Sequence, residues 1–230
     1  MTEGTAQHIV YRFRFADGET AQVDSRSLEG IPYQLPEWTR LETHQCPNCP
    51  LKKETSPHCP LAVQLIPLMR ITGNRYSHQL VDVEVETPGR TYVKTTSVQS
   101  AMGSLMGLLC ATSDCPHMQF LSSLAEFHLP FADEMETVYR VLANYLVSQY
   151  ILKDHGSTPD WDLEGLRARY AELITVNEHM ANRIRSASEK DGAVNALVIL
   201  DSLARALQFS MDIKFEELKP YFRRILKQGM

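Results

Sequence analysis

Residues 79–94 read QLVDVEVETPGRTYVK and mark where this chain changes from predicted strands to predicted helices. Apolar and polar residues largely alternate over residues 79–85, as they do in a strand that buries one face. Residues 87–90 have the composition of a turn, and residues 91–94 can return as a second strand. The stretch therefore predicts an antiparallel hairpin.

A second hairpin is predicted nearer the N-terminus, over residues 8–25. Residues 8–15, HIVYRFRF, alternate in part, residues 16–19 supply a turn with Asp and Gly, and residues 20–23 return. Two such hairpins can combine into one four-stranded antiparallel sheet, whereas each alone is only marginally stable.

The residues after about position 97 are predicted to be helical. Asp133 and Glu136 have the spacing of a capping box at a helix start, and Gly103 and Gly107, four apart, would allow a close approach between helices. No clean linker interrupts the chain. We therefore predict a single α+β domain over residues 1–230, in which residues 1–97 hold the sheet and a cysteine loop, and residues 98–230 form a helical, bundle-like part.

The cysteines form the most specific pattern in the sequence. Four of the five are each followed by proline, although proline is only 12 of 230 residues; these are Cys46, Cys49, Cys59 and Cys115. Four equivalent thiolates are what a tetrahedral structural metal site requires. The set predicts a metal site that joins the sheet-containing part to the helical part.

Proline suits these positions for physical reasons. It stiffens the loop before a metal arrives, and it removes the N–H immediately after each sulfur, which leaves later amides free to donate to the thiolate. Pro60 and Pro116 are also predicted to begin helices, whose N-termini carry partial positive charge. Pro67 is predicted to kink or end the helix that begins at Pro60.

Zinc is the predicted metal, because it prefers four thiolates in tetrahedral geometry. An iron–sulfur cluster is the alternative, since four cysteines also hold such clusters and Cys-Pro occurs in their loops. A cysteine set without bound metal is the third reading. His58 precedes Cys59 and His117 follows Cys115 by two residues; each could replace a cysteine ligand, hydrogen-bond to a ligand, or simply be a loop histidine.

The sequence around three other residues predicts their surroundings in the fold. Cys110 lies in an apolar run and is predicted to be a buried, inert thiol. His128, in Phe-His-Leu-Pro-Phe at residues 127–131, is predicted to cap the last carbonyls of a helix, with a ligand-pocket histidine as the alternative. Arg183, among interleaved acidic and basic residues, is predicted to belong to a salt-bridged surface.

Composition limits the classes of partner. With 23 Lys and Arg against 28 Asp and Glu, the net charge is -5, and the chain lacks the excess positive charge that phosphate backbones attract. Nucleic acid is therefore not expected as a partner. No apolar run is long enough to span a membrane, and the first residues do not resemble a signal peptide. Together with clustered cysteines, these features predict a cytoplasmic protein.

The cysteine-proline series resembles a family of bacterial proteins of unknown function. The resemblance rests on CPNCPL at residues 46–51, HCPL at 58–61, SDCPH at 113–117 and FHLPF at 127–131, with weaker support from residues 136–140 and 149–150. It implies a bacterial origin and the importance of the Cys-Pro set. It implies no substrate and no reaction.

These observations predict a zinc-stabilised, cytoplasmic binding or regulatory module without catalytic activity of its own. The sequence has no Walker A loop, GxGxxG, GxSxG or HExxH motif. A protein partner or self-association is expected, and a small-molecule ligand in the helical half is a further expectation. The alternative is a redox or ligand sensor, or an enzyme, that uses an iron–sulfur cluster or an open metal site at the same cysteines.

Overall fold

The computed structural model describes residues 8–25, 32–72, 75–209 and 211–228, with the backbone alone for residues 203, 206–209 and 211–214. The described strands are β1 Val10–Phe15, β2 Thr20–Asp24, β3 Leu80–Thr87 and β4 Arg90–Ser97. The α-helices are α1 Pro60–Gln64, α2 Ile66–Thr72, α3 Val98–Ala111, α4 Ser122–Glu126, α5 Glu134–Asp154, α6 Glu164–Ala187, α7 Gly192–Phe209, α8 Met211–Leu218 and α9 Arg223–Gln228. Three short 3-10 helices complete them: η1 Glu37–Thr39, η2 Gln119–Leu121 and η3 Lys219–Phe222.

Both predicted hairpins are present and combine into one sheet. The strand order is β2-β1-β3-β4 and every neighbouring pair is antiparallel, so β1 and β3 lie in the centre. In the register between them, Tyr11 lies opposite Val85 and Phe13 opposite Val83. The four-stranded antiparallel sheet in the N-terminal half is thus confirmed.

Alternation in the strands decides which face of the sheet is buried. Tyr11, Phe13 and Phe15 of β1 are at most 5% exposed, and Val81, Val83 and Val85 of β3 at most 2%. The intervening residues face solvent, where Arg12 forms ion pairs with Glu84 and Glu86 of β3. One apolar face therefore needs a covering layer.

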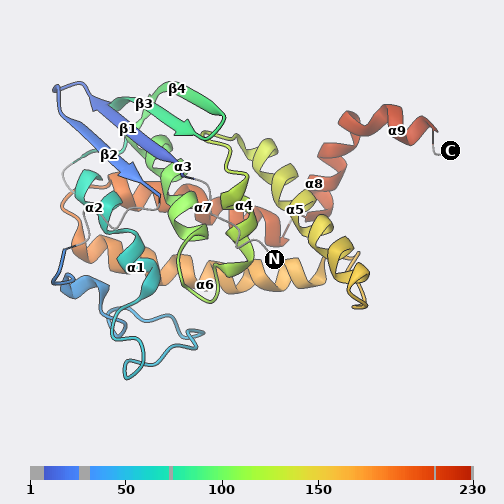
Figure 1. Ribbon diagram of the computed structural model, residues 1–230, viewed down its shortest axis with the longest axis horizontal. Coiled ribbons are helices and arrows are strands. Elements are labelled where there is room, and N and C mark those ends of the chain that lie inside the picture. Colours follow the sequence, from blue (N-terminus) through green and yellow to red (C-terminus); the bar gives the residue numbers. More distant parts are fainter. Residues whose placement is uncertain (1–7, 26–31, 73–74, 210, 229–230) are drawn as a thin grey trace.

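The helices supply that layer (Figure 1). Helix α3 follows β4 directly and lies against the sheet, α7 packs on α3, and the long α6 packs on α7. Buried residues of the sheet and of these helices belong to one continuous apolar core. Helices α8 and α9 lie at the end of the molecule opposite the sheet.

Local sequence signals explain several helix boundaries. The predicted capping box at the start of α5 is formed: the Asp133 carboxylate accepts from the Glu136 amide at 2.7 Å, and the Glu136 carboxylate accepts from the Asp133 amide at 2.9 Å. Pro60 occupies the first turn of α1, as predicted. The helix is interrupted at Leu65, between α1 and α2, just before Pro67, as a proline at that position predicts; Pro67 itself lies in the first turn of α2.

The two glycines of α3 are not required for close packing. A Cβ added at Gly103 would lie 3.7 Å from the Ala196 carbonyl oxygen, and one at Gly107 would lie 3.9 Å from Cδ2 of Leu200. Both are ordinary van der Waals distances. Helix α3 does pack closely on α7, as the glycine spacing would allow, but an alanine would also fit at either position.

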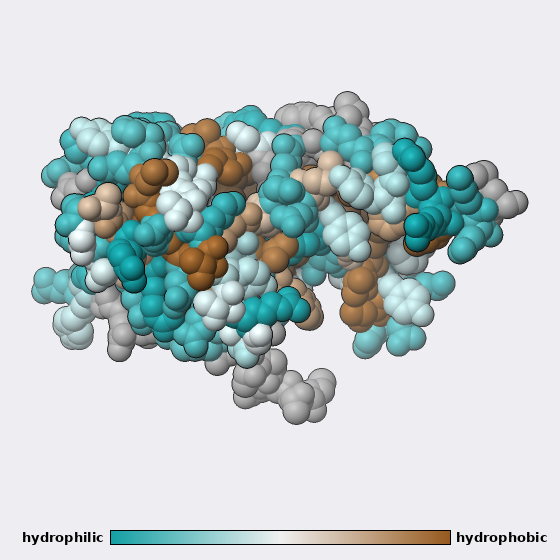
Figure 2. All heavy atoms as spheres, turned by 90° about the horizontal axis from the view of Figure 1, so that it is seen from above, coloured by the Kyte–Doolittle hydropathy of each residue, from teal (hydrophilic) through white to brown (hydrophobic). Residues whose placement is uncertain are grey.

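Seen from the sheet side, the surface is mainly hydrophilic, with hydrophobic side chains showing in separate groups (Figure 2). Exposed large apolar residues include Tyr150 and Ile151 of α5 and Ile225 of α9. Within the residues that the structure describes, no helix combines the length and apolar character needed to cross a membrane.

Candidate functional site

Three of the four Cys-Pro cysteines lie in the loop that leads into α1. A tight turn closes the Cys-x-x-Cys unit, because the Cys49 amide donates to the Cys46 carbonyl at 3.0 Å. The Cys59 amide donates to the Thr39 carbonyl at 2.8 Å, and Cys59 is the N-cap residue of α1. Backbone hydrogen bonds thus fix the main chain at all three cysteines.

Cys115 reaches the same region from the end of α3. The residues after it form a turn, in which the Met118 amide donates to the Cys115 carbonyl at 2.9 Å. The predicted helix at Pro116 is therefore wrong: regular structure begins only at Gln119, in η2. The backbone amides of His117 and Met118 act to lower the pKa of Cys115, which is the effect expected of amide donors near this sulfur.

The four Cys-Pro sulfurs are electrostatic neighbours. Burial raises the pKa of Cys46 to about 12, and Cys59, Cys49 and Cys115 add to the rise, while Arg183 opposes it. Burial likewise raises the pKa of Cys115 to about 11, against the effect of its two amide donors. The fold therefore brings these cysteines together from segments that are far apart in sequence.

Ligand geometry is not formed in this arrangement. Among the described residues, no three His, Cys, Asp or Glu side chains are arranged to hold a metal ion. All five cysteines are free thiols. The cysteines of the set share one region, but their sulfurs are not gathered around one ion position.

Cys110 differs from this set. It is 5% exposed, within the apolar part of α3, and burial raises its pKa to about 12, with a smaller effect of Cys115. The buried position predicted for it is confirmed. A thiol held protonated in this way is a poor nucleophile.

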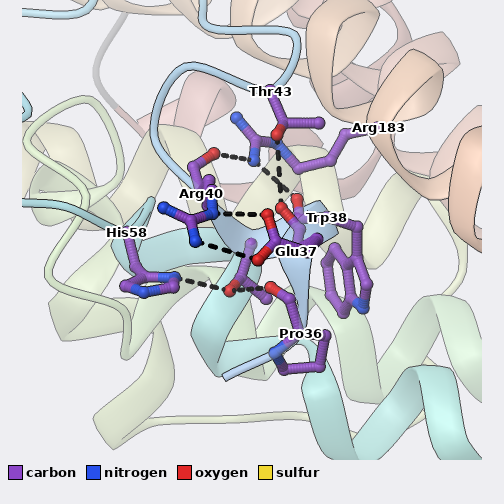
Figure 3. A network of polar contacts seen from close by, with 8 residues as sticks. Pro36, Glu37, Trp38, Arg40, Thr43, His58 and Arg183 are labelled. Carbon is purple, nitrogen blue, oxygen red and sulfur yellow. Dashed lines mark hydrogen bonds and ion pairs between the residues drawn. The ribbon is translucent and has the colours of Figure 1, made fainter. Parts of the chain in front are cut away.

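Arg183 is the residue of this region that sequence reasoning misplaced. It lies on α6 and is 2% exposed, so the predicted salt-bridged surface position is wrong. Its guanidinium donates to the backbone carbonyls of Trp38 at 2.7 Å, Arg40 at 2.5 Å and Leu41 at 3.1 Å. Figure 3 shows the side chain pointing into the turn around η1, with dashed lines to the first two of these oxygens.

The charge of Arg183 has no carboxylate partner. No Asp or Glu oxygen of the described residues lies within 4.0 Å of its guanidinium. Burial lowers the pKa of Arg183, and Cys59, Cys46 and Cys49 oppose that shift. The groups that could balance this buried cation are thus the thiols of the cysteine loop.

The two histidines near the cysteines are both ordered by hydrogen bonds. His58 Nδ1 lies 2.8 Å from Thr39 Oγ1, and the same hydroxyl donates to the Pro36 carbonyl at 2.7 Å (Figure 3). Since a hydroxyl has one proton, Nδ1 of His58 must be the donor to Thr39. The Nε2 lone pair of neutral His58 therefore remains available.

His117 instead connects three segments. Its Nε2 lies 2.9 Å from the Asn48 carbonyl, inside the Cys46–Cys49 turn, and its Nδ1 lies 3.9 Å from a Glu172 carboxylate oxygen on α6. Asn48 also donates to the Glu172 carbonyl at 3.2 Å. These contacts favour a role in positioning the cysteine loop over a role as ligand.

The chain belongs to the family described as Domain of unknown function (DUF6901), which matches residues 9–223. The match takes in the sheet, the cysteine loop and most of the helical part. No curated protein and no solved structure matches the chain significantly.

Proposed function

We propose that Cys46, Cys49, Cys59 and Cys115 bind one Zn²⁺ as a structural cross-link, and that the protein is a binding or regulatory module. The observation that carries the proposal is the Arg183 guanidinium, which is buried beside these thiols without a carboxylate partner. Buried charges in proteins are paired or coordinate metals. Protonated thiols cannot pair a cation, whereas a zinc–thiolate centre can.

The charges are consistent with this assignment. Four thiolates around a divalent ion carry a net charge of about -2, and Arg183 would offset part of it. The backbone amides of His117 and Met118, which act to lower the pKa of Cys115, would stabilise the same negative charge. Both features stabilise negatively charged thiolates. Neither would stabilise neutral thiols packed in the same place.

A zinc ion here would tie together parts of the chain that are far apart in sequence and that His117 already links through the Asn48 carbonyl. It would hold the loop before α1 to the segment after α3, and the hydrogen bonds of Arg183 hold the same loop to α6. Closing long loops constrains the unfolded chain most, and binding free energy at such a site adds to folding free energy.

A closed set of four thiolates leaves no open coordination position, which favours a structural role over a catalytic one. The alternative at the same cysteines is an iron–sulfur cluster or an open site with His58 as a nitrogen ligand. His58 supports that alternative, because its Nε2 lone pair is free when Nδ1 donates to Thr39.

Single Cys→Ser variants test the ligand set. We expect Cys46→Ser, Cys49→Ser, Cys59→Ser and Cys115→Ser each to lose most bound zinc to a competing chelator, because each removes one of four ligands. Cys110→Ser is the matched control and should retain the metal of the unaltered protein. Zinc content per chain after competition is the measurement. Equal retention in all five variants would contradict the proposal.

A further inference from the structure

A cavity of about 790 Å³ lies beside α3, away from the cysteine loop. Its walls come from α3, α4, α5, α6 and α7, and most of its lining is apolar. Apolar lining residues include Leu108, Met118, Leu121, Leu173 and Ile199. This size and character are those of sites for small molecules.

One end of the cavity carries a buried polar network. The Tyr11 hydroxyl, on the covered face of the sheet, lies 2.7 Å from Ser104 Oγ and 2.6 Å from His128 Nε2. The Phe131 amide donates to Ser104 Oγ at 3.0 Å. His128 Nδ1 has no hydrogen-bond partner among the described residues, so one polar atom of this network is left for a ligand.

Two proton arrangements fit this network, because each bond at the Tyr11 hydroxyl can run in either direction; the one that can serve an anionic ligand has its proton on Nδ1 of His128. Burial, and then the nearby Arg140, lower the pKa of His128 to about 3, so the ring is neutral at neutral pH. When Ser104 donates to Tyr11 and Tyr11 donates to His128 Nε2, the remaining proton lies on Nδ1. Nδ1 is then a hydrogen-bond donor at the polar end of the cavity.

Arg140 adds a positive charge at the same end. It, and not His128, caps the carbonyls at the end of α4: its Nη2 donates to Leu124 O at 3.1 Å and to Phe127 O at 2.7 Å. Its Nε and Nη1 have no hydrogen-bond acceptor within the described part of the chain. The predicted capping role of His128 is therefore wrong, and its place at a cavity agrees with the alternative.

The Arg140 charge is only loosely compensated. No described carboxylate lies within ion-pair distance of it, while burial lowers its pKa and Glu136 opposes that effect from further away. The Glu136 carboxylate itself accepts from the Asp133 amide. Lys94 also lines the cavity. Asp133 and Glu134 line it too, but both are exposed on the first turn of α5.

We propose that this cavity binds a small carboxylate with an apolar body. The carboxylate accepts a hydrogen bond from Nη1 or Nε of Arg140 and another from His128 Nδ1, and the apolar body lies along α3 and α6. Because the Leu124 and Phe127 carbonyls use both Nη2 protons of Arg140, the carboxylate receives a single charge-assisted hydrogen bond from Nη1 or Nε and not a bidentate pair. This inference does not rest on the zinc site.

The glycines of α3 give a way to fill part of the cavity without changing Arg140 or His128. Gly103 and Gly107 line it, and the nearest atoms to an added Cβ are 3.7 and 3.9 Å away. A longer side chain at Gly107, as in Gly107→Met, would extend into the cavity and occupy the volume that the apolar body needs.

Calorimetric titration with decanoate and with 1-decanol tests the proposal. We expect the full chain to bind decanoate about tenfold or more tightly than 1-decanol, because a charge-assisted hydrogen bond forms only with the carboxylate. Arg140→Met should remove that preference, Arg140→Lys should retain part of it, and Arg185→Met, an exposed arginine exchanged in the same way, should leave it unchanged. Gly107→Met should weaken both ligands.

Two results would overturn the proposal: no binding of decanoate by the unaltered chain, or equal affinity for the acid and the alcohol. Thermal unfolding of each variant serves as the check on folding. If Arg140→Met does not fold, the affinities of the unaltered chain and of Gly107→Met for decanoate and 1-decanol still test the proposal.

Discussion

Replacing Arg183 by methionine is expected to lower the free energy of unfolding by about 3–5 kcal/mol, because three buried acceptors lose a charged donor and each such loss costs about 1–3 kcal/mol. The substitution leaves the carbonyls of Trp38, Arg40 and Leu41 without their donor, and buried acceptors without partners are costly. Arg185→Met, on the exposed side of the same helix, should change stability very little. Urea unfolding of both variants is the measurement. A similar effect of the two substitutions would contradict the burial of Arg183.

The metal dependence of that loss separates two roles of Arg183. If the side chain only satisfies carbonyls, Arg183→Met should cost the same with and without zinc. If it also balances a zinc–thiolate centre, the cost should be larger in the metal-loaded protein, and the two changes should be non-additive in a double-mutant cycle with Cys115→Ser. If the effects of the two substitutions are additive, Arg183 only holds the loop in place, and it no longer supports the presence of a metal.

Removing the metal with a strong chelator is expected to lower the melting temperature by about 10 °C or more. Loss of a structural zinc removes several kcal/mol of folding free energy, and in a chain of this size each kcal/mol shifts the melting temperature by about 2–4 °C. Thermal unfolding with and without chelator, with metal content measured in parallel, gives the comparison.

Removal of the metal should destabilise the linked segments before it affects the whole fold. Amide hydrogen exchange is expected to rise first in residues 41–59 and 112–118, which the proposed metal would link, because these segments lie outside the helices and strands. The sheet and α3 should remain protected. An unchanged melting temperature after complete removal of the metal would show that the cross-link carries no stability.

Much of the fold could be predicted because its signals are local. Alternation in β1 and β3, the capping box at Asp133 and Glu136, and Pro60 at the start of α1 each depend on residues close in sequence. These features agree with the structure. The proximity of Cys115 to the cysteine loop also followed from sequence, through the shared Cys-Pro unit.

The predictions are wrong for residues whose position depends on tertiary contacts. Arg183 was assigned to the surface because its neighbours are charged, although it lies three residues after Met180 and seven after Val176, both buried on α6. That helical spacing was the available signal. His128 shows the same limit: nothing within its own segment reveals that Tyr11, on a strand more than a hundred residues away, is its partner.

The central claim is that four Cys-Pro thiolates hold one zinc ion. Elemental analysis of untagged, anaerobically purified protein, with an absorbance spectrum of the same sample, tests it most directly. The account predicts about one zinc per chain and no visible absorbance. Iron with sulfide and a visible band would make the site an iron–sulfur centre and contradict the zinc assignment, and a protein free of metal that binds no added zinc would contradict the site itself.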